Sequence, residues 1–354
     1  MRKISLKNAQ KGMKLAKPIF SVEGYVLLGK GIFLKQAYIN RLESLNVSEI
    51  YIQDDISEDI EINDIIDEGT RNQAKVLVKR VMDDYKANRR FSADSSVIMV
   101  NRIIDELLSN KNVVVNLGDI KTIDDYTFSH SVNVCVLSLI VGMKLGLDQL
   151  KLRDLGVGAL LHDIGKVLIP EEILKKPFEL TPEEFKLIKE HTVLGYDIIK
   201  SDPNVRATSA YIVLSHHERF DGSGYPRQIK GENIHMFARI VAIADVYDAL
   251  SSDRVYRNKF KTYEVIEYLN TVAVNGFDRD ILEQFVKSIP IYAIGTSVLL
   301  NTGEKGIVVD TNKDFPTRPI VRVICRADGT RYNNFEEIDL TRKLNIIITD
   351  TCEI

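Results

Sequence analysis

The stretch LLHDIGK, residues 160–166, decides how the rest of this sequence is interpreted. His162 and Asp163 are adjacent, so one imidazole can bind a metal ion while the neighbouring carboxylate bridges to a second ion. Leu155, Ala159 and His162 share one face of a predicted helix, and we therefore expect the pair to point into the core. In an isolated His-Asp pair, the histidine is more often a buried core residue with a hydrogen-bond partner than a metal ligand. The positions of the other histidines distinguish these two interpretations.

Four further histidines and one aspartate lie among apolar residues at helical spacing. They are His130, His191, His216, His217 and Asp245. Burying this many polar groups without partners would cost roughly several kcal/mol each. Divalent metal ions satisfy such groups directly, and a donor set of nitrogen and oxygen suits iron or manganese, with zinc as the alternative, better than magnesium. The sequence therefore predicts a metal centre inside a helical domain.

The composition is that of a globular protein of about two domains, since the chain has 354 residues with 45% hydrophobic and 27% charged residues. A net charge of −3 argues against binding to a nucleic acid polymer or to an acidic membrane surface. We expect no membrane insertion, because no run of about 18 uncharged apolar residues is evident. The polar N-terminus and three scattered cysteines predict a cytoplasmic protein without disulfides.

Changes in periodicity divide the chain into four segments. Residues 1–68 form a β-rich module, in which a Glu-Gly turn joins two strand-like runs before a short helix and a strand. Residues 69–112 are connecting helices that could form a homodimer seam. Residues 113–290 are densely helical and contain all six histidines, and residues 291–354 form a small β module. The predicted fold class is mainly α, with a central all-α bundle between β-rich N-terminal and C-terminal modules.

Local signals support these segments. Thr181, Pro182 and Glu184 form a capping box with proline at the first helical position, which predicts that a helix begins there. Thr302-Gly303 and Asp328-Gly329 predict turns between strands of the last module.

Four motifs in fixed order resemble the HD-GYP subgroup of the HD superfamily of metal-dependent phosphohydrolases. They are HDIGK (162–166), His191, HHERFDGSGYP (216–226) and ADVYDAL (244–250), with Arg254 and Arg257 shortly after. The resemblance covers residues 115–290 and implies that the central bundle is of the HD type. It is specific because several spaced elements occur together and in order.

The resemblance implies a dinuclear centre and a substrate pocket around it. One metal would be bound by His130, His162, Asp163 and Asp245, and the other by His191, His216 and His217, with Asp163 bridging. Asp163 and Lys166 would be catalytic, Lys166 facing a substrate phosphate. Gly224, Tyr225 and Pro226 would shape the pocket, and Arg254 and Arg257 would bind phosphate or guanine.

The activity implied by the resemblance is hydrolysis of the bacterial signalling molecule cyclic di-GMP to pGpG, with or without a second cleavage to GMP, by a hydroxide between two metals. Three alternatives stay open: a hydrolase of cyclic GMP-AMP or a nucleoside phosphate, a di-iron oxygenase, and a cyclic-dinucleotide receptor with little turnover. The GYP loop and the two arginines favour a phosphate substrate over the oxygenase. The complete ligand set argues against the receptor.

One position departs from relatives that bind a third metal. Those proteins carry a glutamate four residues before the first histidine, where this sequence has Tyr126. A phenol with a pKa near 10 is a poor ligand, and Asp124 and Asp125 lie at other angles around the predicted helix. We therefore expect two metals.

Overall fold

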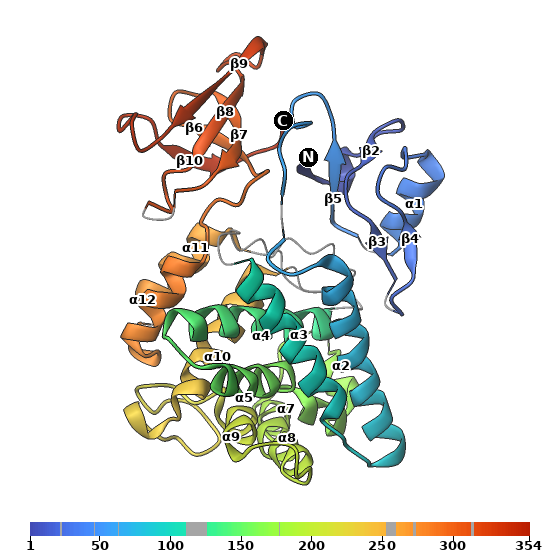
Figure 1. Ribbon diagram of the computed structural model, residues 1–354, viewed down its shortest axis with the longest axis vertical. Helices are drawn as coiled ribbons and strands as arrows, with labels where there is room; N and C mark the ends of the chain where they lie inside the picture. The colour runs from blue at the N-terminus through green and yellow to red at the C-terminus, as the bar shows by residue number, and fades with distance from the viewer. Residues whose placement is uncertain are drawn as a thin grey trace. The chain divides into compact units, whose positions relative to one another are not determined.

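Helical periodicity in the middle of the sequence and strand patterns at its two ends produce two units in the computed structural model (Figure 1). The model describes residues 1–21, 23–45, 47–62, 64–110, 126–176, 178–252, 260–271, 274–312 and 315–354. Unit 1 contains Met1–Ile65 and Ile289–Ile354, and unit 2 contains Ile66–Lys111 and Tyr126–Ser288. The predicted domain boundaries at residues 68, 112 and 290 stay a prediction.

Unit 2 is helical, and its described residues contain no strand. Its elements are α2 (Glu68–Asn88), α3 (Asp94–Ser109), α4 (Tyr126–Lys144), α5 (Gln149–Leu160), η3 (Ile164–Leu168), α6 (Glu171–Leu174), α7 (Pro182–Lys189), α8 (His191–Ile199), α9 (Ala207–Ser215), η4 (Gly231–Asn233), α10 (Met236–Ser251), α11 (Thr262–Thr271), η5 (Val274–Gly276) and α12 (Arg279–Ser288). The predicted capping box is confirmed: Thr181 Oγ1 accepts from the Glu184 amide, and Glu184 Oε2 accepts from the Thr181 amide.

The core of unit 2 lies where α4, α5, α9 and α10 pack together, with α2, α3 and α12 against this group. Val134, Leu137 and Val141 of α4 are buried, as their spacing from His130 predicts. Close packing between α5 and α9 depends on Gly158, where a Cβ atom would lie 2.9 Å from the carbonyl oxygen of Ser209. The helices expected to be connectors, α2 and α3, are therefore part of the packed helical unit.

Helix α4 also has the length and composition of a membrane span, contrary to our expectation that no such stretch exists. The window Thr127–Lys144 has a mean hydropathy of 1.2, but 78% of it is buried within the structure. Such burial is typical of the core helix of a folded domain.

Unit 1 contains the β-rich modules. Its elements are β1 (Arg2–Ser5), η1 (Leu6–Asn8), β2 (Lys14–Leu15), β3 (Ile19–Phe20), β4 (Val26–Leu28), α1 (Gln36–Ser44), β5 (Glu49–Gln53), β6 (Ser297–Leu300), β7 (Lys305–Asp310), β8 (Ile320–Cys325), β9 (Arg331–Asp339) and β10 (Ile348–Thr351). The strands form antiparallel sheets in the orders β1-β5-β2, β3-β4 and β10-β6-β7-β8-β9. The turns predicted at Gly24, Gly303 and Gly329 are confirmed, and all three glycines have positive φ.

The N-terminal and C-terminal modules share contacts within unit 1. Tyr51 and Ile56 belong to the same buried cluster as Ile307 and Ile324. Arg322 donates to both carboxylate oxygens of Asp59 at 2.6 Å. The predicted fold class, a helical bundle with small β-rich modules from both ends of the chain, is therefore confirmed.

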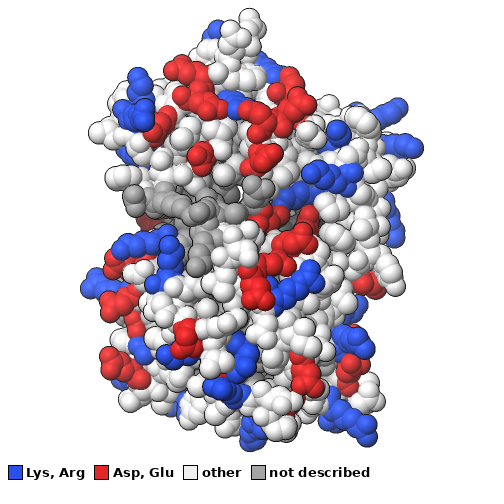
Figure 2. Space-filling model, in the orientation of Figure 1, with Lys and Arg blue, Asp and Glu red and all other residues white. Residues whose placement is uncertain are grey.

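The surface carries both signs of charge. Figure 2 shows lysine and arginine side chains interspersed with aspartate and glutamate over the described residues of the visible face. This distribution agrees with the nearly balanced composition of 47 basic and 50 acidic residues.

Candidate functional site

Two of the predicted ligands come from the middle of core helices. His130 lies on α4 and Asp245 on α10, and these helices pack together. His130 Nε2 lies 3.1 Å from Asp245 Oδ1. Both side chains are almost completely buried, as the apolar residues at helical spacing around them predict.

The remaining ligands lie at helix ends, and for His162, Asp163 and His191 this differs from the regular helical positions that we expected. His162 and Asp163 follow the end of α5, His191 is the first residue of α8, and His216 and His217 follow α9. Consecutive residues on a regular α-helix point about 100° apart. A turn after the helix allows His162 and Asp163 to point toward the same place, with His162 Nε2 3.3 Å from Asp163 Oδ2.

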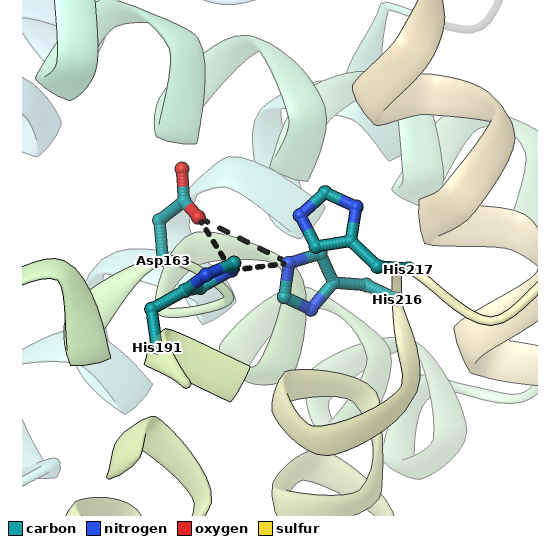
Figure 3. A group of neighbouring side chains, drawn as sticks. All are labelled: Asp163, His191, His216 and His217. Carbon is teal, nitrogen blue, oxygen red and sulfur yellow. Dashed lines mark hydrogen bonds and ion pairs between the residues drawn. The ribbon is translucent and has the colours of Figure 1, made fainter. Parts of the chain in front are cut away.

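Asp163 lies between the other ligands. Its Oδ1 is 3.4 Å from His191 Nε2 and 3.9 Å from His216 Nε2 (Figure 3). Its Oδ2 is 4.0 Å from His130 Nε2. The carboxylate therefore faces histidines from both halves of the predicted ligand set, as a bridging ligand would.

Backbone carbonyl groups orient three of the histidines. Nδ1 of His162 lies 2.8 Å from the Ala159 oxygen, and Nδ1 of His191 lies 2.6 Å from the Ile188 oxygen. Nδ1 of His216 lies 2.9 Å from the Val213 oxygen. A carbonyl oxygen only accepts, so each neutral imidazole carries its proton on Nδ1 and directs the lone pair of Nε2 into the site. Such orientation is typical of metal-binding histidines.

The resulting arrangement needs a cation. Nε2 of His191 and Nε2 of His216 lie 3.3 Å apart, although neither carries a proton when Nδ1 is the donor. Nε2 of His162 and Oδ1 of Asp163 are buried without a hydrogen-bond partner among the described residues. Lone pairs that converge in a buried site repel one another unless a positive charge lies between them. The donor set therefore fits divalent metal ions.

The ligand atoms form two groups. Asp163, His191, His216 and His217 make up one group, and His130, His162 and Asp245 make up the other, with the donor atoms in each group within 4.8 Å of one another. All seven sequence-predicted ligands are thus brought together. Their division agrees with the two metal positions that the resemblance implies, since Asp163 also lies near His130 and His162.

Burial and charge set the protonation of these groups in the metal-free protein. Burial lowers the pKa of His191 to about 4 and that of His217 to about 3, so both imidazoles are neutral at pH 7. Burial opposes ionisation of Asp163, but Lys166 and the nearby histidines outweigh it and hold the pKa of this carboxyl well below its usual range. His130 is the exception, since Asp245 and Asp248 outweigh its burial and raise its pKa to about 9, so it must lose a proton before it binds metal.

The predicted pocket residues surround these ligands. Lys166 Nζ donates to Asp163 Oδ2 at 2.5 Å, and its side chain is 30% exposed. The Tyr225 ring lies 4.7 Å from the His217 ring, at an interplanar angle of 31°. Gly224 approaches the backbone so closely that a Cβ atom would lie 2.5 Å from the Cα of Glu218. This approach requires glycine and holds the GYP loop beside the metal ligands.

Some predicted residues lie outside the described part of the chain. These are Arg254 and Arg257, along with Asp124 and Asp125. Tyr126 is the first residue of α4, but its side chain also lies outside the described part. The expected roles of these residues stay predictions.

Three buried residues around His130 were missed by the sequence analysis: Asp248, Asn133 and Arg71. Asp248 Oδ2 lies 2.8 Å from His130 Nδ1, and Asn133 Nδ2 donates to Asp248 Oδ1 at 2.8 Å. A signal was available for two of them, because Asn133 follows His130 by three residues and Asp248 follows Asp245 by three, which places each pair on one helix face.

Family models match two parts of the chain. A model described as an HD domain matches residues 108–281, which include all the predicted metal ligands. A model described as a KOW domain associated with an HD domain matches residues 297–354 of the C-terminal module.

Similar proteins agree with these matches. A cyclic di-GMP phosphodiesterase of Pseudomonas aeruginosa is 35% identical over 257 residues, which are 72% of this chain and 62% of the relative. A cyclic di-GMP phosphodiesterase of Thermotoga maritima is 38% identical over 165 residues, which are 46% of this chain and 45% of the relative. The chain thus spans less than two thirds of the length of either relative.

One solved structure supports the fold. An HDG"Y"P protein from Bdellovibrio bacteriovorus is similar with a TM-score of 0.50 at 19% identity, over 80% of this chain and 97% of that protein. The HD-domain match, in turn, includes the motifs around His162, His191 and His216. The chain belongs to the HD-GYP family of HD-domain proteins.

Proposed function

We propose that this protein is a metal-dependent phosphodiesterase that hydrolyses a cyclic dinucleotide, and that cyclic di-GMP is its substrate. The observation that carries the proposal is the position of Asp163 between two groups of buried nitrogen and oxygen donors. The relatives named above act on cyclic di-GMP. Bound divalent ions, which we expect to be iron or manganese, would activate a water molecule and neutralise charge on the phosphoryl oxygens.

The chain's own residues would hold the substrate beside this centre. Lys166 has an ammonium group next to Asp163 and a partly exposed side chain, so it can bind a phosphate oxygen while the ligands stay in place. The Tyr225 ring on His217 would limit the space beside the reacting phosphate. Arg254 and Arg257 would bind the other phosphate or a guanine edge.

The proposed reaction consumes one water molecule for each bond broken. A water oxygen adds to phosphorus, the bond from phosphorus to the 3′ oxygen breaks, and that oxygen leaves as a hydroxyl after taking up a proton. The first cleavage opens the ring and produces pGpG. A second cleavage, with a second water, would produce GMP.

The test is turnover by protein that has been loaded with one metal at a time under anaerobic conditions. Fe²⁺, Mn²⁺ and Zn²⁺ forms would be incubated with cyclic di-GMP, cyclic GMP-AMP and nucleoside triphosphates, and the products would be separated by chromatography. We expect metal-dependent release of pGpG from cyclic di-GMP, and no release by Asp163→Asn protein. Binding without turnover would favour a receptor, and preference for another nucleotide would change the substrate. Oxygen consumption without phosphodiester cleavage would favour an oxygenase.

Location and assembly belong to the same proposal. We infer a cytoplasmic enzyme that could act as a homodimer, since a cyclic dinucleotide signal is made and degraded inside the cell. Size-exclusion chromatography with light scattering would measure the oligomeric state directly.

A further inference from the structure

A line of buried hydrogen bonds leads from helix α2 to the metal ligand His130. Arg71 Nη1 donates to Asn133 Oδ1 at 2.8 Å, and Asn133 Nδ2 donates to Asp248 Oδ1 at 2.8 Å. Asp248 Oδ2 lies 2.8 Å from His130 Nδ1. All four residues are no more than 4% exposed. Three helices, α2, α4 and α10, thus contribute to the orientation of one ligand.

The chemistry of these groups permits only one order of donors and acceptors. The Arg71 guanidinium has only donors, and an ionised Asp248 has only acceptors. The amide of Asn133 lies between them with its oxygen toward Arg71 and its nitrogen toward Asp248. The reverse orientation would place oxygen against carboxylate and NH₂ against guanidinium. Asp248 in turn accepts from Nδ1–H of His130, which leaves Nε2, beside Asp245, as the nitrogen that would bind a metal ion.

His130 is oriented differently from three other histidines of the site. Backbone carbonyls one helical turn earlier in the chain orient His162, His191 and His216. Those orientations are local and persist as long as the helix end persists. His130 Nδ1 instead faces a side chain from another helix, 118 residues away in sequence. The orientation of His130 is therefore sensitive to the position of other helices.

Helix α2 is one of the helices whose position affects the orientation of His130. Arg71 lies in its first turn, six residues after Ile65, the last residue of the N-terminal part of unit 1. The same turn is held by Asp67, which caps the helix, and by Thr70, which donates to Glu106 of α3 at 2.6 Å. Hydrogen bonds weaken steeply with distance and angle. A small shift of this turn would therefore loosen Asn133 and Asp248.

Stability alone does not account for Arg71. Its guanidinium is buried, and Nη2 has no hydrogen-bond partner among the described residues. A buried charge with incomplete partners is costly, and an apolar side chain of similar volume is often at least as stabilising. We propose that Arg71 is a positioning residue, which holds the metal ligand His130 through Asn133 and Asp248, so that the position of α2 sets the metal affinity of the His130 group.

The inference rests on the proposed metal centre, and metal binding tests it apart from turnover. The metal would be removed by chelation, and the full chain would be titrated with Co²⁺ under anaerobic conditions while its visible absorption is recorded. Arg71→Met should weaken the binding of one of two Co²⁺ ions by up to about 10-fold, the lower end of the roughly 10–100-fold effect of losing a direct partner of a metal-bound histidine, and leave the binding of the other unchanged. Arg71→Lys, which can still donate to Asn133, should recover part of the affinity.

The matched control is Arg80→Met. Arg80 lies on the same helix as Arg71, but its side chain is 78% exposed and pairs with Asp84 one turn further along α2. This variant should bind both Co²⁺ ions like the parent. Circular dichroism would show that each variant is folded before it is titrated.

A double-mutant cycle of Arg71→Met with Asp248→Asn makes the test sharper, because Asn133 lies between these two side chains and is hydrogen-bonded to both. If they act in one line, the combined loss of affinity is smaller than the sum of the single losses. Additive losses, or an Arg71→Met variant with parental affinities, would overturn the inference. A parent that binds no Co²⁺ would overturn both the inference and the metal centre. A parent that binds Co²⁺ but cleaves no cyclic dinucleotide would overturn the proposed function alone.

Discussion

Gly165 lies against the backbone of His191, so closely that a Cβ atom on residue 165 would collide with the His191 carbonyl oxygen. The same Cβ atom would lie 2.6 Å from the backbone nitrogen of Gly195. Gly165 belongs to η3, which directly follows Asp163, and His191 begins α8. The absence of a side chain at residue 165 therefore allows the two segments that carry Asp163 and His191 to meet.

We predict that Gly165→Ala separates these segments. Because backbone atoms cannot move aside like a flexible side chain, the substitution should lower the free energy of unfolding by about 1–3 kcal/mol, as overpacking in a core does. It should also weaken the binding of the metal ion that His191 is proposed to hold. Thermal unfolding and metal analysis would measure both effects. Gly29→Ala is the control, because nothing lies within 4 Å of a Cβ atom there and φ is not positive. Equal behaviour of the two variants would contradict the prediction.

Asp163→Ala should remove metal from both groups and abolish hydrolysis, because its two oxygens face histidines on either side. His162→Ala should also inactivate the enzyme but can leave one metal bound. Metal per chain would be measured by mass spectrometry after gel filtration. Asp197→Ala, which removes an exposed carboxylate on α8, should retain both metals. Two metals and normal turnover in Asp163→Ala protein would mean that Asp163 is not a shared ligand.

Arg254→Ala and Arg257→Ala should weaken cyclic di-GMP binding without changing the metal content. Loss of one hydrogen bond to a charged phosphate costs on the order of 1.5–3 kcal/mol, which is about a 10–150-fold loss of affinity. Calorimetric titration with cyclic di-GMP, with each arginine replaced in an otherwise inactive variant, would measure this loss of affinity. The exposed Arg90 offers a control, since Arg90→Ala should bind like the parent. Metal loss in the first two variants would instead indicate a structural role.

The unmodified protein should hold two metals per chain, because Tyr126 stands where relatives with a third metal have glutamate. Tyr126→Glu would add a carboxylate one helical turn before His130 and should raise metal uptake toward three ions per chain. Metal analysis of both proteins after identical anaerobic loading tests this expectation. A third ion in the unmodified protein would make Asp124 or Asp125 the ligand and refute our interpretation of Tyr126.

Acid should destabilise the metal-free protein. Burial lowers the pKa of His191 to about 4 and of His217 to about 3, whereas an unfolded histidine titrates near 6.5. Between these values the unfolded chain binds more protons than the folded chain, so the free energy of unfolding falls as pH decreases from about 6.5 to about 4. Urea unfolding at several pH values would measure the slope. Replacing His217 by Gln should reduce the slope, and an unchanged slope would contradict the assignment.

Local structure could be predicted from the sequence where it depends only on residues that are close together in the chain. The capping box at Thr181 and Glu184 needs only four consecutive residues, and it begins α7 as expected. The turn at Asp328-Gly329 needs only the conformational freedom of glycine, and φ of Gly329 is +87°. Helical spacing around His130 likewise placed that side chain in the core.

Helix ends were harder to predict. Apolar spacing suggested that His162 and Asp163 lie on a regular helix, but α5 ends at Leu160 and both residues lie in the turn that follows. Periodicity measures which residues face the core and does not report where hydrogen bonding stops. The difference matters for function, since only a turn brings two consecutive side chains to one site.

The kinds of donor in the site and the helical segments that supply them could be predicted from the sequence, because ligand chemistry and apolar spacing are local properties. Two relationships became visible only in the folded protein: Asp163 lies between two groups of donors, and Arg71 is connected to His130 through Asn133 and Asp248. Those relationships join residues up to 118 positions apart. They depend on how close α2, α4 and α10 pack, and this distance follows from side-chain volumes in the whole core rather than from any one motif.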